Sequence, residues 1–180
     1  MKLTRVHSPR TKTFSKVWYI FRTSFWPDER RTRRQESKLL ANSHYRLWAV
    51  WDQKELVGTV TIWDLKKWYF VEHLAVKRSR RDRGYGSKIM RRVMARTNKP
   101  WVLEVGRSRD LNNKRRIEFY RRLGFKVNRH TYVQPPYDKT KKFLKLYLMT
   151  YPKKITTGRY IRLNRRIKSI VYQDVLHAEK

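Results

Sequence analysis

Apolar residues recur along the chain at two spacings, and each spacing predicts one kind of element. A spacing of three or four predicts an amphipathic helix over residues 13–25, with its apolar positions at Phe14, Val17, Trp18, Phe21 and Phe25. We expect this helix to face the protein core; a helix lying on a membrane surface is the alternative, because its flanks are basic. Pro27, followed by two acidic residues, predicts the start of a second helix that ends near residues 41–42.

Alternating and β-branched segments predict the strands. Residues 45–51, 56–63 and 68–76 are separated by short turns, so we expect three consecutive antiparallel strands. Further strands are predicted over residues 1–9, 101–105, 125–133 and 143–151, and further helices over 84–97, 111–123 and 161–176. This order predicts an α/β protein with a mixed, mostly antiparallel sheet of about six or seven strands and helices on both faces.

The length of 180 residues suits one domain with a full hydrophobic core. We expect that domain over residues 1–152, followed by a C-terminal extension over 153–180 that can form a helix packed on it. The chain has no Cys, which excludes disulfides, thiolate metal sites and a Cys nucleophile. Its five His residues show no ligand spacing, so we expect no metal.

The charge is strongly unbalanced, with 46 Lys and Arg against 14 Asp and Glu and a formal net charge of +32. Such a surface favours polyanionic partners such as RNA, the ribosome, DNA, anionic lipid or wall polymer. A lineage-wide or engineered basic surface is the alternative, because the cations are spread along the whole chain. No apolar run approaches the roughly 18 residues of a membrane span, and no signal-peptide pattern is present, so we expect a cytoplasmic protein.

The stretch from Glu72 to Gly86 is the strongest candidate for a binding site. It reads E-H-L-A-V-K-R-S-R-R-D-R-G-Y-G, which predicts a strand, a basic turn and the start of a helix. Unpaired N–H groups and the positive end of a helix dipole make such a junction an anion site. A dinucleotide motif is excluded because its third glycine would be Ile89, and a P-loop because the order here is Gly86-Ser87-Lys88. A plain turn, with glycine present only for its positive φ, remains the alternative.

Two motifs follow one another along the chain at a separation typical of one enzyme family. The first is Leu74-Ala75-Val76 and, after four intervening residues, Arg81-Asp82-Arg83-Gly84-Tyr85-Gly86. The second runs from Asn113 through Phe119-Tyr120 to Leu123-Gly124-Phe125. Together they resemble the GNAT superfamily of acetyl-CoA-dependent N-acetyltransferases over residues 14–151, although Arg116 stands where that family usually has a small residue. The segments 132–137 and 148–152 are similar to small uncharacterised GNAT enzymes of Gram-positive bacteria.

The resemblance implies that acetyl-CoA is the cosubstrate and that the junction holds its pyrophosphate. The amides of residues 81–86 would bind the phosphates, and the side chains of Arg81 and Arg83 would add charge-assisted hydrogen bonds. The backbone of residues 74–76 would pair with the pantetheine, and an N–H there would polarise the thioester carbonyl. The cofactor-binding residues implied are Leu74, Ala75, Val76, Arg81, Asp82, Arg83, Gly84, Tyr85, Gly86, Ser87 and Asn113.

Two residues are candidates for proton transfer. Glu72 is the candidate general base, since an amine with a pKa near ~10.4 must lose a proton before it attacks. The alternative is a carboxylate that only pairs with one of the many Arg residues. His73 is expected on the opposite face of the sheet by alternation, either as a core histidine or as the base itself. Tyr120 is the general acid that the resemblance implies, and a core tyrosine is its alternative.

These residues predict an N-acetyltransferase, a monomer or homodimer, that moves an acetyl group from acetyl-CoA to a primary amine by direct attack in a ternary complex. The alternative is a GNAT-fold module whose main role is binding RNA, the ribosome or another polyanion. By analogy with the family, the acceptor would lie against Phe25, Trp26, Tyr132 and Tyr137. A cationic acceptor would require an acidic cleft, for which Glu72, Glu104 and Glu118 are the few available acids.

Overall fold

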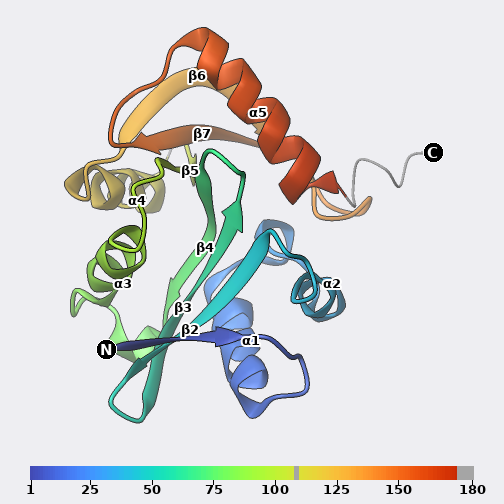
Figure 1. Ribbon diagram of the computed structural model, residues 1–180, viewed down its shortest axis with the longest axis vertical. Helices are drawn as coiled ribbons and strands as arrows, with labels where there is room; N and C mark the ends of the chain where they lie inside the picture. The colour runs from blue at the N-terminus through green and yellow to red at the C-terminus, as the bar shows by residue number, and fades with distance from the viewer. Residues whose placement is uncertain (108–109, 174–180) are drawn as a thin grey trace. The chain divides into compact units, whose positions relative to one another are not determined.

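The computed structural model describes residues 1–107 and 110–173, which contain seven strands and five α-helices (Figure 1). In chain order the elements are β1 (Lys2–Val6), α1 (Lys12–Ser24), the 3-10 helix η1 (Pro27–Glu29), α2 (Arg33–Leu39), β2 (Tyr45–Asp52), β3 (Glu55–Asp64), β4 (Tyr69–Val76), the 3-10 helix η2 (Arg78–Arg80), α3 (Tyr85–Met94), β5 (Trp101–Gly106), α4 (Leu111–Arg122), β6 (Lys126–Gln134), β7 (Leu144–Tyr151) and α5 (Thr157–Val171). The strands form one sheet in the order β1-β2-β3-β4-β5-β7-β6. The predicted class, a mostly antiparallel α/β sheet with helices, is confirmed.

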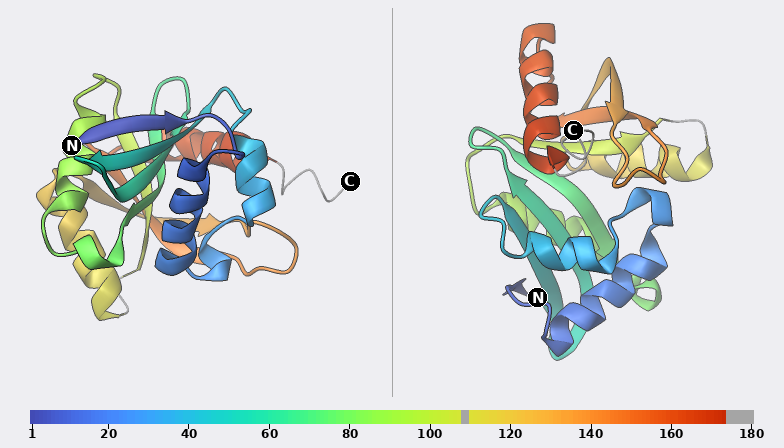
Figure 2. Two further views of the ribbon diagram at one scale, coloured as in Figure 1. Left: turned by 90° about the horizontal axis from the view of Figure 1, so that it is seen from below. Right: turned by 90° about the vertical axis from the view of Figure 1, so that its right-hand side faces the viewer.

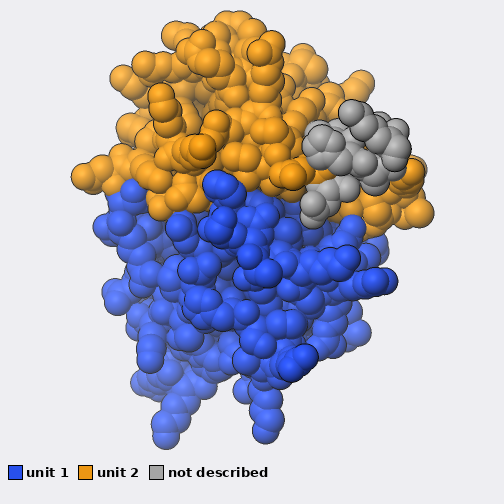
Figure 3. Space-filling model, turned by 45° about the vertical axis from the view of Figure 1, so that its right-hand side comes forward, with its two compact units in different colours: residues 1–63, 71–97 blue, residues 64–70, 98–180 orange. Residues whose placement is uncertain are grey.

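Internal contacts divide the chain into two compact units (Figure 3). Unit 1 comprises residues 1–63 and 71–97, and unit 2 comprises residues 64–70 and 98–180. Unit 1 therefore holds β1, β2 and most of β3 and β4 with helices α1 to α3, whereas unit 2 holds β5, β6, β7, α4 and α5.

In unit 1 the strands pair as an antiparallel meander, with Leu3 of β1 opposite Val50 of β2 and Ala49 of β2 opposite Thr59 of β3. Helices α1 and α2 lie on one side of these strands and α3 lies on the other (Figure 2). Phe21 of α1 packs its ring 5.3 Å from that of His73 in β4. The two-sided cover explains why β3 is buried at nearly every position, since neither of its faces is left to solvent.

In unit 2 strand β7 lies between β5 and β6 and is antiparallel to both, with Leu103 opposite Met149. Helix α5 packs on β6 through one apolar stripe, which consists of Tyr160, Leu163, Ile167 and Val171. The hydroxyl of Tyr160 donates a hydrogen bond to the carbonyl oxygen of Thr131 at 3.1 Å. The remaining positions of α5 are free to carry charge, because burial needs only this stripe.

The prediction of one helix from Pro27 to near residues 41–42 is wrong. Only one 3-10 turn forms at Pro27–Glu29, and α2 begins separately at Arg33. Thr32 accepts a hydrogen bond from the Gln35 amide, and the Gln35 side chain accepts one from the Thr32 amide. This capping box fixes a new helix start and leaves Arg30–Thr32 extended.

The last helix begins earlier than the predicted residue 161, because Thr156 caps its first turn. Its predicted end at Leu176 lies outside the described residues. The predicted domain boundary at residue 152 stays a prediction, and α5 belongs to unit 2. Within the described part of the chain, no helix has the length and apolar character to cross a bilayer.

Gly58 in β3 lies where no larger residue fits. A Cβ at this position would lie 2.6 Å from the carbonyl oxygen of Ala75 and 3.1 Å from the side chain of Ile89. The first of these atoms belongs to the backbone of β4, so it cannot rotate away. The glycine thus lets β3, β4 and α3 approach one another directly below the end of β4.

We predict that Gly58→Ala lowers the free energy of unfolding by about 1–3 kcal/mol, because overpacking forces backbone shifts. Urea denaturation followed by circular dichroism measures this change. Gly158→Ala is the matched control: a Cβ there meets Arg162 at an ordinary 3.7 Å, and alanine favours the first turn of α5. Equal stabilities for the two variants would show that the contact with β4 is not restrictive.

Candidate functional site

The junction of β4 and α3 presents backbone N–H groups that the helix itself cannot use. Gly84 is the N-cap of α3, with a left-handed φ of 75°, and no side chain caps the helix there. Asp82 also has a positive φ, 61°. The amides of Tyr85, Gly86 and Ser87 stand in the first turn, where no preceding carbonyl accepts from them. Left-handed residues next to a helix N-terminus form a concave set of N–H donors, which suits an anion such as phosphate.

Arg81 and Arg83 of this loop differ in their contacts. Arg81 donates from Nε to the Val76 carbonyl oxygen at 3.3 Å and from Nη2 to the Ser24 hydroxyl at 3.2 Å. Its guanidinium thereby joins the loop to the end of β4 and to α1. Arg83 is exposed beside Gly84 and faces solvent. Of the two side chains predicted to bind phosphate, Arg81 therefore has a structural role in the loop, whereas Arg83 is exposed.

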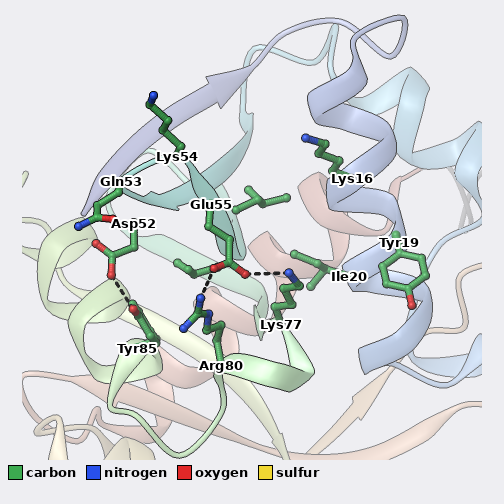
Figure 4. Close-up of a pocket in the computed structure, with 12 residues that line it drawn as sticks. Lys16, Tyr19, Ile20, Asp52, Gln53, Lys54, Glu55, Lys77, Arg80 and Tyr85 are labelled. Atoms are coloured by element: carbon green, nitrogen blue, oxygen red, sulfur yellow. Dashed lines mark hydrogen bonds and ion pairs between the residues drawn. The ribbon is translucent and has the colours of Figure 1, made fainter.

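A cavity of 710 Å³ lies beside the loop in unit 1 (Figure 4). Glu55 in its wall is paired with Lys77 and Arg80. Hydrogen bonds from Arg80 and then Lys77 lower the pKa of Glu55 to about 2. Tyr85, the first residue of α3, donates its hydroxyl hydrogen to Asp52. These bonds, which the sequence pattern did not reveal, hold η2 and the start of α3 against the β2–β3 hairpin.

Glu72 lies in a buried ion pair. Its side chain is fully buried, contacts the guanidinium of Arg31, and accepts a hydrogen bond from the indole nitrogen of Trp63 at 2.8 Å. Burial by itself would raise the pKa of Glu72, but Arg31, His73 and the hydrogen bonds outweigh it, so the pKa is lowered. The residue as a whole is half-buried, so the part of it that solvent reaches is the main chain.

His73 does not point away from Glu72, as simple alternation predicted. Its Nδ1 lies 3.8 Å from a carboxylate oxygen of Glu72, and its Nε2 lies 3.0 Å from the Glu29 carbonyl oxygen, to which it donates. Both side chains contact the segment Glu29–Arg31, since the carboxylate pairs with Arg31 and the imidazole donates to the Glu29 carbonyl oxygen. Burial lowers the pKa of His73, and the ring of Phe25 packs 4.7 Å from it.

A second buried carboxyl group, Glu36 of α2, adjoins this network and was missed by the sequence reasoning. It is 2% exposed and accepts a hydrogen bond from the Tyr45 hydroxyl. Burial, and then the charge of Glu72, raise the pKa of Glu36 to about 7. A signal existed: Glu36 stands three residues before Leu39, on the face by which α2 packs against the protein.

In unit 2 the residues of the second motif lie at the ends of β5 and α4. The Asn113 amide nitrogen donates to Asp110 at 2.6 Å, and a Cβ at Gly106 would overlap the Asn113 side chain. Asn113 is therefore held directly over the end of β5. Tyr120 is 8% exposed, and its burial raises the pKa of the phenol to about 12. Arg116, the departure from the family pattern, is exposed.

The four residues expected to border the acceptor differ in exposure. Trp26 is 74% exposed, whereas Phe25 is half-buried against His73. In unit 2 Tyr132 is buried and donates to Glu104, and Tyr137 is buried beside the ring of Tyr172. Trp26 alone of the four offers a large open surface. Across residues 1–107 and 110–173, no three His, Asp or Glu side chains come together as a metal site would require.

Comparison with known proteins identifies relatives of this fold. Residues 43–127 match the model of the acetyltransferase (GNAT) domain. This matched segment includes the β4–α3 junction, Asn113 and Tyr120. A solved structure from Bacteroides thetaiotaomicron, assigned to the GNAT acetyltransferase family, is 28% identical, covers 96% of this chain and 98% of its own, and superimposes with a TM-score of 0.89. The chain has a GNAT-like fold, and its residues 43–127 resemble the GNAT acetyltransferase domain.

More distant GNAT structures share the fold alone. An aminoglycoside 6'-N-acetyltransferase complexed with coenzyme A is 17% identical over 87% of this chain and 99% of its own, with a TM-score of 0.62. A spermidine N-acetyltransferase from Vibrio cholerae is 14% identical over 83% of this chain and 91% of its own, with a TM-score of 0.59. Comparison with curated protein sequences gives no significant match.

The buried carboxyl group of Glu36 leads to a prediction about the pH dependence of stability. The pKa of Glu36 is about 7 in the folded chain against 4.5 in the unfolded one, so folding favours the protonated form. Its contribution to stability is complete below pH 4.5 and is lost as the pH rises through 7. The loss amounts to about 3 kcal/mol.

Replacement by glutamine removes this titration while keeping an acceptor for Tyr45. The difference in free energy of unfolding between the wild type and Glu36→Gln should therefore fall steadily from pH 4.5 to above 7 in urea denaturation series. Glu118→Gln, which changes an exposed residue of α4, should give no such trend. Parallel curves for wild type and Glu36→Gln would contradict the raised pKa.

Proposed function

We propose that the protein transfers an acetyl group from acetyl-CoA to a primary amine by direct attack in a ternary complex. The observation that carries this proposal is the N-terminus of α3, which no side chain caps and which follows β4 through η2 and a loop with left-handed Asp82 and Gly84. In a GNAT domain this is the feature that suits the pyrophosphate of a CoA thioester. Support for an amine acceptor comes from the aminoglycoside and spermidine acetyltransferases of the same fold.

Binding of the cosubstrate would use main chain more than side chain. The amides of Tyr85, Gly86 and Ser87 would donate to phosphate oxygens, and Arg83 would add its charge. The backbone of β4 around Leu74 would pair with the pantetheine amides, and an N–H there would donate to the thioester oxygen as negative charge develops on it. In unit 2, Asn113, oriented by Asp110, would bind the pantetheine arm.

Tyr120 suits the leaving group because of its environment. With a pKa of about 12, its phenol stays protonated at neutral pH and can donate a hydrogen bond. A coenzyme thiol, with a pKa near ~8.5 like that of cysteine, is the stronger acid of the two. Tyr120 would therefore stabilise the departing thiolate mainly by hydrogen bonding, and the proton released by the attacking amine would finally neutralise it.

Glu72 is the proposed acceptor of the proton that the amine loses. Its surroundings make protonation of this carboxylate less favourable. A pKa below the ordinary value keeps the carboxylate ionised and ready to accept, but makes it a weaker base. Accepting a proton would also weaken the pair with Arg31. The alternative role is to hold Arg31, and with it the Glu29–Arg31 segment, against β4. The two roles make different predictions for a double variant.

The first test of the proposal concerns the cosubstrate. Isothermal calorimetry should show acetyl-CoA binding, and a thiol-release assay with a panel of primary amines should show transfer. Tyr120→Phe should lower kcat by about 100-fold while changing the Kd for acetyl-CoA little, because only the hydrogen bond to the leaving thiolate is removed. Failure of the wild-type protein to bind acetyl-CoA would overturn the proposal, and an unchanged kcat would remove Tyr120 from it.

The second test separates the two roles of Glu72. Glu72→Gln should destabilise the fold by about 3–5 kcal/mol, because Arg31 is left buried without its partner. Arg31→Gln with Glu72→Gln should recover much of that stability, since no unpaired charge remains. If Glu72 accepts the proton, kcat stays at least about 100-fold low in the double variant. If kcat returns with stability, Glu72 only positions the segment.

A further inference from the structure

Unit 2 contains a second concave site, which shares no lining residue with the proposed cofactor motifs. It is a cavity of 880 Å³ bordered by the β3–β4 turn, Pro100 and one face of α5. The lining residues are Lys66, Lys67, Trp68, Pro100, Arg159, Arg162, Leu163, Arg165, Arg166 and Ser169. Six of these ten residues are Lys or Arg and none is acidic. We call this site the α5 groove.

The cations of the α5 groove are placed by ordered structure on both sides. On α5, Arg159, Arg162 and Arg166 fall three and four residues apart, so they share one face of the helix. Arg166 donates from Nε to the carbonyl oxygen of Leu65 at 2.9 Å, which ties the helix to the β3–β4 turn. The turn is closed by a hydrogen bond from the Leu65 amide to the Trp68 carbonyl oxygen at 2.8 Å. The groove therefore exists before any ligand binds.

Among the described residues, no acidic side chain lines the α5 groove. Like charges three or four residues apart destabilise a helix, and a cation near its N-terminus opposes the dipole, as Arg159 does here. Helix α5 has no acidic residue in its first turn, and none among its fifteen residues. The cavity of unit 1 differs: there Asp52 and Glu55 accompany the cations in the wall. An external anion would relieve the repulsion that the groove tolerates.

The shape and the apolar lining narrow the class of anion. Trp68 is half-buried and lines the groove beside Pro100 and Leu163, so a flat apolar surface adjoins the cations. Regularly spaced phosphates next to planar bases match this combination, because bases stack on aromatic side chains while the backbone follows cations. A lipid surface is flat and would contact protruding cations better than ones lining a cavity. We propose that the α5 groove binds single-stranded nucleic acid.

The proposal does not rest on acetyl transfer. The family model ends at residue 127, so the α5 side of the groove lies outside the segment that identifies the GNAT domain. The binding of nucleic acid to the groove can therefore be measured in the absence of acetyl-CoA. An acetyltransferase that lacked nucleic-acid affinity, or a nucleic-acid binder without transferase activity, would each refute one proposal and leave the other intact.

The test uses the whole chain and a fluorescein-labelled oligouridine of about 12 nucleotides. Anisotropy should show binding whose affinity falls steeply with salt between about 50 and 200 mM. The variant Lys67→Gln/Arg162→Gln/Arg165→Gln removes three groove charges and keeps Arg166, which holds the turn. It should bind at least about tenfold more weakly, with the log–log salt slope reduced by about 2.

The matched control removes three exposed charges from β6 and β7, in the variant Lys126→Gln/Arg129→Gln/Lys145→Gln. Its net charge equals that of the groove variant, so it should lose no more than about twofold in affinity if the groove is the site. Trp68→Leu should weaken binding about tenfold without changing the salt slope, because stacking rather than charge is removed. Circular dichroism must show the native fold for each variant that is compared.

Three outcomes would overturn the proposal. Equal losses in the groove and control variants would mean that only the total charge matters. An unchanged affinity of the Trp68→Leu variant for the oligouridine would show that bases do not stack on Trp68. Binding to vesicles of anionic phospholipid that competes fully with the oligouridine, and that is stronger than binding of the oligonucleotide, would assign the groove to a membrane surface. A parallel titration with oligodeoxythymidine distinguishes RNA from DNA, since only RNA offers the 2′-hydroxyl.

Discussion

The pair of buried charges formed by Glu72 and Arg31 is the constraint around which unit 1 is arranged. Neither charge can be buried unpaired without a cost of several kcal/mol, so the two side chains must meet. Glu72 belongs to β4, whereas Arg31 lies in the extended segment before α2. Their contact therefore attaches the segment between α1 and α2 to β4, the strand that precedes the α3 junction. Trp63 completes the arrangement by donating to the same carboxylate.

Acidic side chains serve mainly internal partners in this protein, and that use shapes its surface. Glu36 bonds to Tyr45, Glu55 to Arg80, and Glu104 to the hydroxyls of Tyr132 and Tyr172. With 14 acids against 46 cations, such pairings leave few carboxylates to moderate the exterior. The α5 groove is the place where this imbalance is concentrated in a concavity, since six cations line it and no acid does. The use of the few acidic residues for internal hydrogen bonds and ion pairs thus leaves the surface with a large excess of positive charge.

Local sequence was sufficient for the elements and for the α3 junction. Helix α1, the meander and helices α3 and α4 follow from apolar periodicity, because each element buries one stripe or face regardless of its neighbours. The junction could be recognised because its N–H donors depend only on where a helix starts and on glycine at Gly84. The break before α2 was missed because a capping box at Thr32 competed with the helix-start signal at Pro27.

Contacts between distant segments could not be predicted in this way. Nothing near Glu72 in sequence indicates Arg31, 41 positions away, and alternation did not predict that the His73 ring approaches the Glu72 carboxylate. The raised pKa of Glu36 arises from burial and from Glu72, both of which exist only after α2 has packed. The α5 groove likewise joins Lys66–Trp68 to residues 159–169, which the sequence showed only as dispersed charge.

The sequence by itself determined the fold class, the two motifs that resemble the GNAT family and the helix start at the β4–α3 junction. These depend on short-range patterns of side-chain polarity, glycine and helix ends, which are present in any local window of the chain. Only the tertiary structure decided which charges are buried together, which tyrosines donate to carboxylates and where the surplus cations gather. Those properties are set by distance and desolvation between segments far apart in sequence, and both come into being when the segments pack.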